Sequence, residues 1–210
     1  MADVAGGQGR GAAARELRAV AAEAAGCTRC DLYRRATQTV FGEGSVPAPL
    51  LLVGEQPGDK EDLAGEPFVG PAGRVLDEAL GAAGVDRGRV YVTNAVKHFK
   101  WEPRGKRRIH KTPGATEIQA CAGWLAEELA HVDPAVVVAM GTTAVRAVFG
   151  RALSISSLRG RVHELAGGRQ AVVTVHPAAV VRQRDAAARR AALDGMVADL
   201  RLAANVAVPR

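Results

Sequence analysis

The stretch "LLLVGEQPGD", residues 50–59, indicates the fold of this chain. Its first four residues form an unbroken apolar run, and the residues from Gly54 onward are polar or turn-forming. An unbroken apolar run, rather than an alternating one, is typical of a strand buried on both faces of a parallel sheet. Three more such runs follow along the chain, at residues 90–93, 136–140 and 171–175.

Helical patterns separate and follow these runs, at residues 72–83, 116–131, 142–149 and 185–204. Alternating strands and helices predict an α/β fold: a three-layer αβα sandwich with a central, mainly parallel four-stranded sheet. Each apolar run leads into a polar segment, and these segments begin at Gly54, Asn94, Gly141 and His176. Because ligands bind at the carboxyl ends of parallel strands, we expect the four segments to form one cleft.

The bulk composition predicts one globular domain with a polyanionic partner. The chain has 210 residues, 48% of them hydrophobic, and a net charge of +6 that favours nucleic acid. We expect a flexible tail over residues 1–12 and a single domain over 13–205, opening with a helix over 13–25. No apolar run is long enough to span a membrane and no signal peptide is recognisable, so we expect a cytoplasmic monomer.

Several residues at the predicted strand ends are candidates for chemistry. Glu55 and Asp59 could orient a water or another nucleophile, although Pro57-Gly58 also explains a simple turn. Phe68 lies in a glycine-rich loop, where it either plugs the core or stacks on a base. A single histidine is more often structural, but the position of His176 at a strand end favours a catalytic role.

The three cysteines form a candidate metal site. Cys27 and Cys30 are spaced to hold one metal ion or cluster, and Cys121 lies far along the chain. We choose His98 as the fourth ligand, with His110 and His131 as weaker alternatives. Three unrelated buried thiols are the simpler interpretation, and the spacing does not separate zinc from an iron–sulfur cluster.

The most basic segment is "WEPRGKRRIHKTPG", residues 101–114. Its glycines and prolines predict a loop without helix or strand, and its basic residues predict contacts with phosphate. His110 stands at the end of the run Lys106-Arg107-Arg108-Ile109, where phosphate binding alone gives it no special task.

Together these segments resemble the uracil-DNA glycosylase superfamily, especially its iron–sulfur branch. "GEQPG" is similar to the first motif, "HPAAVVR" to the second and "TNAVK" to the strand end that carries the uracil-reading Asn94. That branch normally has four cysteine ligands, and here His98 stands in place of the third. Gln56 and the insertion "RGKRRIH" most resemble UdgX, the group that becomes covalently attached to DNA.

The resemblance implies a glycosylase that excises uracil and then links His110 to the sugar C1′. It implies a 4Fe-4S cluster, with zinc as the weaker alternative, and uracil-containing DNA as partner, single strands included. The implied catalytic residues are His110, Glu55, His176, Asp59 and Gln56. Uracil would be bound by Phe68, Asn94, Gly54, Gln56 and His176, and DNA by Lys106, Arg107, Arg108 and Arg182.

Two other functions remain open from the sequence. One is a conventional, multiple-turnover uracil-DNA glycosylase in which His110 only contacts phosphate. The other is a metal-stapled nucleic-acid-binding module without chemistry. Glu55 and His176 argue against the module, because binding alone needs lysine and arginine rather than an acid and a histidine.

Overall fold

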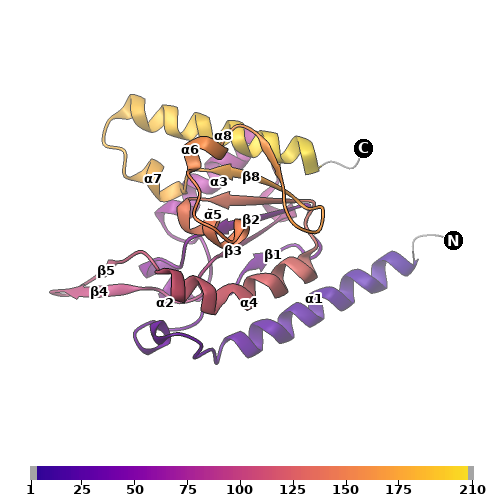
Figure 1. Cartoon of the computed structure of the whole chain (residues 1–210), viewed down its shortest axis with the longest axis horizontal. Coiled ribbons are helices and arrows are strands. Elements are labelled where there is room, and N and C mark those ends of the chain that lie inside the picture. The colour runs from indigo at the N-terminus through magenta and orange to yellow at the C-terminus, as the bar shows by residue number, and fades with distance from the viewer. Residues whose placement is uncertain (1–3, 208–210) are drawn as a thin grey trace.

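The computed structural model describes residues 4–207, and side chains from Gly11 onward. A six-stranded sheet forms its centre, with strand order β1-β3-β2-β6-β8-β7 (Figure 1). The strands are β1 (Glu43–Gly44), β2 (Leu50–Gly54), β3 (Val90–Asn94), β6 (Val136–Met140), β7 (Val162–Glu164) and β8 (Gln170–Thr174).

The four inner strands are parallel, as the apolar runs predicted. The sheet has six strands rather than four because β1 and β7 pair antiparallel with its two outer edges. These edge strands escaped prediction because they are only two and three residues long and carry polar residues. Such short strands take their conformation from the neighbouring strand rather than from their own composition.

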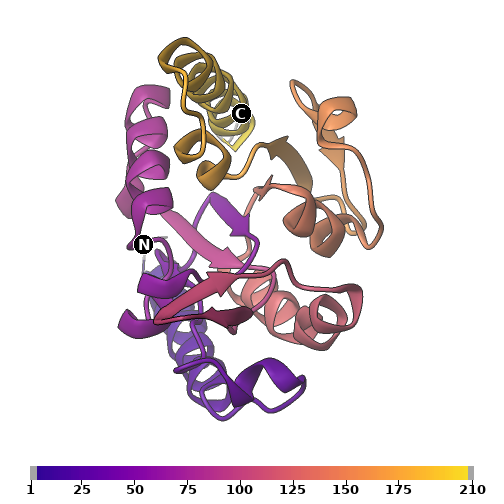
Figure 2. The same cartoon turned by 90° about the vertical axis from the view of Figure 1, so that its left-hand side faces the viewer.

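Helices cover both faces of the sheet (Figures 1 and 2). Leu76 and Leu80 of one helix and Met196 and Leu200 of another pack against Leu52 on one face. On the opposite face, leucines and valines of three further helices pack against Leu51 and Val53. The first layer contains α3 (Pro71–Ala83) and α8 (Ala186–Ala207), and the second contains α1 (Val4–Ala24), α4 (Ala115–Val132) and α5 (Thr142–Phe149).

The three-layer αβα prediction is therefore confirmed, with one difference at the amino end. Helix α1 begins at Val4, whereas the sequence predicted a flexible tail up to residue 12. The glycines in "VAGGQGRG" disfavour a helix by about 1 kcal/mol each, which explains the prediction. Helix propagation from the alanine-rich part continues through them. Residues 1–3 of the predicted tail lie outside the described residues.

The basic segment is not the irregular loop that its glycines and prolines predicted. It forms a hairpin of β4 (Trp101–Arg104) and β5 (Arg107–His110), in which Trp101 pairs with His110. Gly105 has φ 59°, so it supplies the left-handed conformation that a two-residue hairpin turn needs. Pro103 is tolerated because a two-stranded hairpin leaves each strand an unpaired edge.

The polar segments after the strands converge at one edge of the sheet. Gly54 at the end of β2 is in register with Asn94 at the end of β3. The Gly141 amide donates to the Thr174 carbonyl at 3.0 Å, which brings the segment after β6 beside the end of β8. The short helices α2 (Asp59–Ala64), α6 (Ile155–Leu158) and α7 (Pro177–Val181) complete the fold. Within residues 4–207, no helix combines the length and apolar character needed to cross a membrane.

Candidate active site

A cavity of about 260 Å³ lies where the strand ends converge. It draws residues from all three predicted motifs and from the hairpin, so segments more than 120 residues apart in the chain meet there. Most of the predicted catalytic and uracil-binding residues line it. The lining residues are Glu55, Gln56, Gly58, Glu61, Phe68, Ala72, Asn94, His110, His176, Ala178 and Arg182.

Gly54 leaves the space on which the inner part of this cavity depends. A Cβ atom on Gly54 would stand 2.4 Å from Asn94 Oδ1, 2.7 Å from Phe68 Cζ and 3.4 Å from His176 Nε2. The side chains of these three residues therefore approach one another around a residue without a side chain. Any larger residue at position 54 would collide with Asn94 and Phe68.

Phe68 is held in an unusual backbone conformation at the cavity. Its φ is 60°, a left-handed conformation that a bulky residue seldom adopts. The Phe68 carbonyl lies where a Cβ on Gly73 would be, so Gly73 permits this conformation. Glu61 accepts a hydrogen bond from the Gly70 amide at 2.7 Å and fastens the same loop to α2. The Phe68 ring faces the His176 ring with 6.3 Å between centroids and 29° between planes.

His176 presents a hydrogen-bond donor to the cavity. Its Nδ1 accepts from the Ala178 amide at 3.1 Å, so the proton of the neutral ring is on Nε2. That Nε2 atom is buried and has no hydrogen-bond partner within the described residues. Burial lowers the pKa of His176 to about 4, the nearby Glu55 charge opposing this shift. The ring is therefore neutral at physiological pH, with an unsatisfied N–H at the cavity.

Asn94 is held from behind by a buried ion pair that the sequence did not reveal. Lys97 Nζ donates to the Asn94 carbonyl at 2.8 Å and to Glu128 Oε2 at 2.6 Å, and both charged side chains are fully buried. Thr93 and Tyr91 also donate to the Glu128 carboxylate. This network joins the end of β3 to α4. It fixes the backbone of Asn94 while leaving the side-chain amide facing the cavity.

His110 and Glu55 bring an imidazole and a carboxylate into contact at the cavity. His110 Nε2 lies 3.2 Å from Glu55 Oε1, and the His110 side chain is 48% exposed. Thr143 Oγ1 donates to the other carboxylate oxygen of Glu55 at 3.3 Å. Burial alone would raise the pKa of Glu55, but the contact with His110, aided by His176 and Thr143, outweighs burial and lowers the pKa. Glu55 is therefore ionised beside the imidazole.

Gln56 borders the cavity, but its amide is committed to the base of the hairpin. Its Oε1 accepts from the Lys100 amide at 3.0 Å, and its Nε2 donates to the carbonyls of Lys100 and Lys111. Lys100 and Lys111 themselves form a backbone hydrogen bond directly below the strands. Gln56 thus holds the base of the hairpin that carries His110.

Arg108 fastens the same hairpin to α2. Its guanidinium reaches Asp59 Oδ1 and Asp62 Oδ2, each at 2.5 Å, and it also donates to Thr37. Arg108, which the sequence predicted to contact phosphate, is thus paired with carboxylates of the protein itself. Asp59, a predicted catalytic residue, is the exposed partner of this ion pair and does not line the cavity.

The other predicted DNA contacts have no such partners. Across residues 4–207, the ion pairs of the run 106–108 involve Arg108 alone, which leaves Lys106 and Arg107 available. Arg182 follows α7 and borders the cavity.

Two of the three cysteines, Cys27 and Cys121, are buried beside α4, and Cys30 is half-buried. Cys27 and Cys121 share an apolar cluster with Trp124, whose Nε1 donates to Cys27 Sγ at 3.2 Å. Burial raises the pKa of Cys121 to about 11; Lys97 opposes this shift, and the nearby thiolates of Cys30 and Cys27 add to it. This placement is compatible with a shared cluster, and the alternative of three unrelated thiols stays open.

His98 lies in the segment between Asn94 and the hairpin. Its Nε2 is 2.9 Å from Thr39 Oγ1, and its Nδ1 is buried without a hydrogen-bond partner. His131, a weaker alternative ligand, contacts Glu16 and Glu127 instead. Within residues 4–207, no three histidine, cysteine or acidic side chains stand close enough to hold a single metal ion. A cubane cluster places each ligand on a different iron atom, so its ligands stand farther apart. Cys27, Cys30, Cys121 and the unpartnered Nδ1 of His98 are the groups that could hold such a cluster.

Sequence reasoning missed four residues that shape the site. Thr143, Glu61, Asp62 and Glu128 each hold a predicted site residue or its loop. The polar segment "GTTA" after β6 was a signal for Thr143, because it follows a strand end. Glu128 lies inside a helical pattern, where an acidic residue ordinarily means a solvated face. Glu61 and Asp62 follow the polar turn after β2, and no local pattern distinguished them from other surface acids.

Comparison with known proteins gives consistent matches. The Uracil DNA glycosylase superfamily matches residues 41–201. A type-4 uracil-DNA glycosylase of Thermotoga maritima is 38% identical over 169 residues, which cover 80% of this chain and 84% of that protein. The type-4 enzymes of Pyrobaculum aerophilum and Archaeoglobus fulgidus are 36% and 37% identical, over 75% and 74% of this chain and 80% and 78% of theirs.

Proposed function

Because the chain belongs to the uracil DNA glycosylase superfamily, we propose that it excises uracil from DNA and then bonds covalently to the DNA through His110. The observation that carries the covalent step is the 3.2 Å contact between His110 Nε2 and ionised Glu55 at the mouth of the cavity. An exposed imidazole beside a carboxylate, facing the same cavity as His176, is an arrangement for a nucleophile.

Uracil enters the cavity after leaving the base stack. Phe68 stacks on the ring, and the side-chain amide of Asn94 pairs with its N3–H and O4. Cytosine presents the reversed order of donor and acceptor, so it would leave buried groups unpaired at a cost of about 1–3 kcal/mol. Gly54 gives the ring the space to reach Asn94.

His176 stabilises the departing base. The C1′–N1 bond breaks with both electrons moving to uracil, which leaves an anion and a cation-like sugar. The Nε2–H of neutral His176 donates to uracil O2, where negative charge develops. A donor fixed in a water-poor site stabilises this charge without reorganising, and single donors of this kind contribute 10²–10³ in rate in other enzymes, to order of magnitude.

His110 then captures the sugar. The lone pair of one imidazole nitrogen forms the bond to C1′, and the proton on the other nitrogen passes to, or is shared with, Glu55. A group poised at about 10⁵ M or more in effective concentration outcompetes water. Thr143 holds the second oxygen of Glu55, which turns the first toward His110. The product is an N-glycosidic link, so each molecule acts once.

Two attachments hold His110 ready for this step. Gln56 secures the base of the hairpin, and Arg108 ties β5 to Asp59 and Asp62. We therefore propose Gln56, Asp59 and Arg108 as positioning residues rather than as contacts to uracil or phosphate. Lys106, Arg107 and Arg182 contact the DNA backbone, which positions the strand without reading its sequence.

We also propose that Cys27, Cys30, His98 and Cys121 hold a 4Fe-4S cluster. Bound there, the cluster would staple the segment after α1 to α4 and supply no step of the reaction. His98 as a ligand would account for its buried, unpartnered Nδ1. We propose in addition that the protein is a cytoplasmic monomer and that it accepts single-stranded DNA.

A denaturing gel of the protein mixed with a uracil-containing single-stranded oligonucleotide tests the function. We expect a protein–DNA band that survives SDS and heat, and that is absent with a thymine oligonucleotide and for His110→Ala. His131→Ala is the matched control, because His131 lies on α4 and does not line the cavity. Free protein with an abasic, alkali-cleavable oligonucleotide would instead support the conventional enzyme. Intact DNA with free protein would contradict both.

A further inference from the structure

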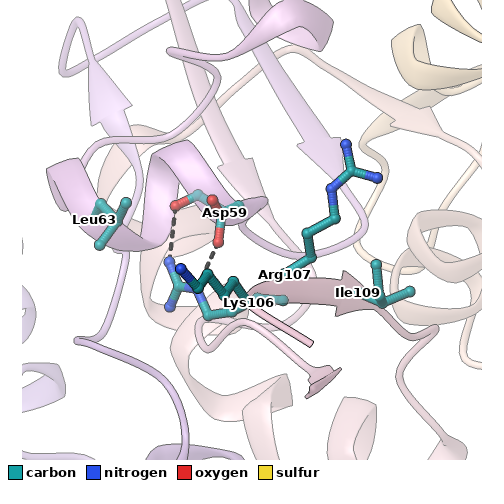
Figure 3. Close-up of a pocket in the computed structure, with 6 residues that line it drawn as sticks. Asp59, Leu63, Lys106, Arg107 and Ile109 are labelled. Atoms are coloured by element: carbon teal, nitrogen blue, oxygen red, sulfur yellow. Dashed lines mark hydrogen bonds and ion pairs between the residues drawn. The ribbon is translucent and has the colours of Figure 1, made fainter. Parts of the chain in front are cut away.

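A second cavity, of about 450 Å³, opens beside the active-site cavity. Leu63 and Asp59 project into it from α2, while Lys106, Arg107 and Ile109 come from the hairpin (Figure 3). Arg108 also lines it. None of the uracil-binding residues proposed above lines this cavity.

The two cavities are built from the same two walls. Gly58 borders the active-site cavity and the next residue, Asp59, borders the second. In β5, His110 borders the active-site cavity and Ile109 the second. Neighbouring residues of the same two segments therefore line both cavities.

The second cavity combines an apolar wall with free positive charge. Leu63 is 61% exposed, the most exposed large hydrophobic residue among those described. Leu63 shares the cavity with Ile109, so its exposed apolar surface lies beside a second apolar side chain and next to basic groups. Lys106 and Arg107 stand at its rim without ion-pair partners across residues 4–207. The carboxylate of Asp59 is offset by Arg108, so the rim stays net positive.

The geometry of this cavity is fixed by the Arg108 ion pairs. Arg108 bonds Asp59 and Asp62 of α2, so the two walls cannot drift apart. The guanidinium also lies 5.4 Å from the Phe99 ring centre and 5.6 Å from that of Trp101, which support it from the hairpin side. The cavity is thus formed before any ligand arrives.

We propose that this cavity holds the base of a nucleotide that flanks the uracil in single-stranded DNA, an inference that rests on the proposed function. The base packs against Leu63 and Ile109, and its phosphate meets Lys106 or Arg107. A base that is paired in a duplex cannot turn out to reach Leu63 without losing its partner. The cavity therefore favours single strands.

The spacing agrees with a nucleotide close to the uracil. Three residue steps separate Arg107 from His110, which span about 10 Å of strand. A stacked DNA strand advances about 3.4 Å per nucleotide, so the cavity lies about one to three nucleotides away. Leu63 and Ile109 have no hydrogen-bonding groups in their side chains. They can sense the size of a base but not its identity, so purines should be preferred over pyrimidines.

The test compares oligonucleotides that lack a single base at one to three nucleotides on either side of the uracil. Each is mixed with the wild-type protein, with Leu63→Ala and with Lys60→Ala, and the rate of uracil release is measured. We expect one position at which loss of the base, and with it the burial of Leu63, slows the wild type about tenfold. Leu63→Ala should be slowed less than twofold by the same loss, because the contact is already gone. Lys60→Ala is the matched control from the exposed surface of α2 and should behave as the wild type.

Uracil release is the chosen readout because it precedes any covalent bond. If no oligonucleotide releases uracil, the proposed function fails. If uracil is released but base removal slows the wild type and Leu63→Ala equally at every position, or slows neither, the flanking-base site is refuted.

Discussion

The two histidines of the active-site cavity differ in every physical respect that separates their proposed tasks. His176 follows a central strand, its Nε2 is buried, and burial keeps it neutral. His110 lies on a hairpin outside the main sheet, is 48% exposed and touches an ionised carboxylate. A group that stabilises charge benefits from a rigid, water-poor site, whereas a nucleophile needs access to the sugar. The difference in burial therefore distinguishes the two proposed roles: buried His176 stabilises charge, and exposed His110 attacks the sugar.

Replacing His110 should give the largest effect, a complete loss of adduct. His110→Ser removes the imidazole while keeping a small polar residue on the exposed strand. Uracil release should continue, because His176 and Asn94 are untouched, and the protein should turn over. A denaturing gel and a uracil-release assay on the same reaction measure both. A persistent crosslink in this variant would refute the assignment.

Replacing His176 should slow uracil release, the step proposed for the buried histidine. His176→Ala deletes the donor to the departing base, so we expect uracil release to fall by about 10²–10³. The adduct should fall in parallel, because it can form only after the bond breaks. Single-turnover release of uracil provides the measurement. A variant that releases uracil at the wild-type rate would show that His176 is structural.

The buried histidine should also make stability depend on pH. Its pKa is about 4 in the folded protein and near 6.5 when unfolded, so below pH 6.5 the unfolded chain binds the extra proton. The contribution of neutral His176 is full above pH 6.5 and is lost as pH falls toward 4, by up to about 3 kcal/mol. Urea unfolding from pH 4.5 to 7.5 measures this. His176→Asn should flatten the dependence, and an equal slope in both proteins would contradict it.

Neutralising Glu55 should slow the covalent step proposed for His110. Glu55→Gln keeps the shape but removes the negative charge that accepts the imidazole proton. We expect adduct formation to slow by about a hundredfold, the lower end of the range of general-base effects. Uracil release should change less. A quenched time course of crosslinking gives the rate, and an unchanged rate would remove Glu55 from the mechanism.

Thr143 should give the smallest effect. Thr143→Val removes one long hydrogen bond to Glu55, worth about 1 kcal/mol, so crosslinking should slow about fivefold. The pKa of Glu55 should rise, which moves the acid limb of the pH–rate profile upward. Thr143→Ser should restore both the rate and the profile. If serine fails to rescue, the threonine acts by packing rather than through its hydroxyl.

Much of the fold was predictable because its signals are local. The runs that became β2, β3, β6 and β8 are apolar without interruption, and a strand buried on both faces must be so. The edge strands and the hairpin were not predictable. Their pairing partners, rather than their own composition, make them extended.

The sequence by itself determined the four parallel strands and the gathering of Glu55, Asn94 and His176 at one edge, because parallel strands all end there. Only the tertiary structure decided which polar residues line the cavity and which hold them from behind. Arg108 pairs with Asp62 across 46 positions of the chain, and Thr143 reaches Glu55 across 88. No local pattern encodes such contacts. They form only after the sheet and helices have packed, and they aim His110 at the cavity.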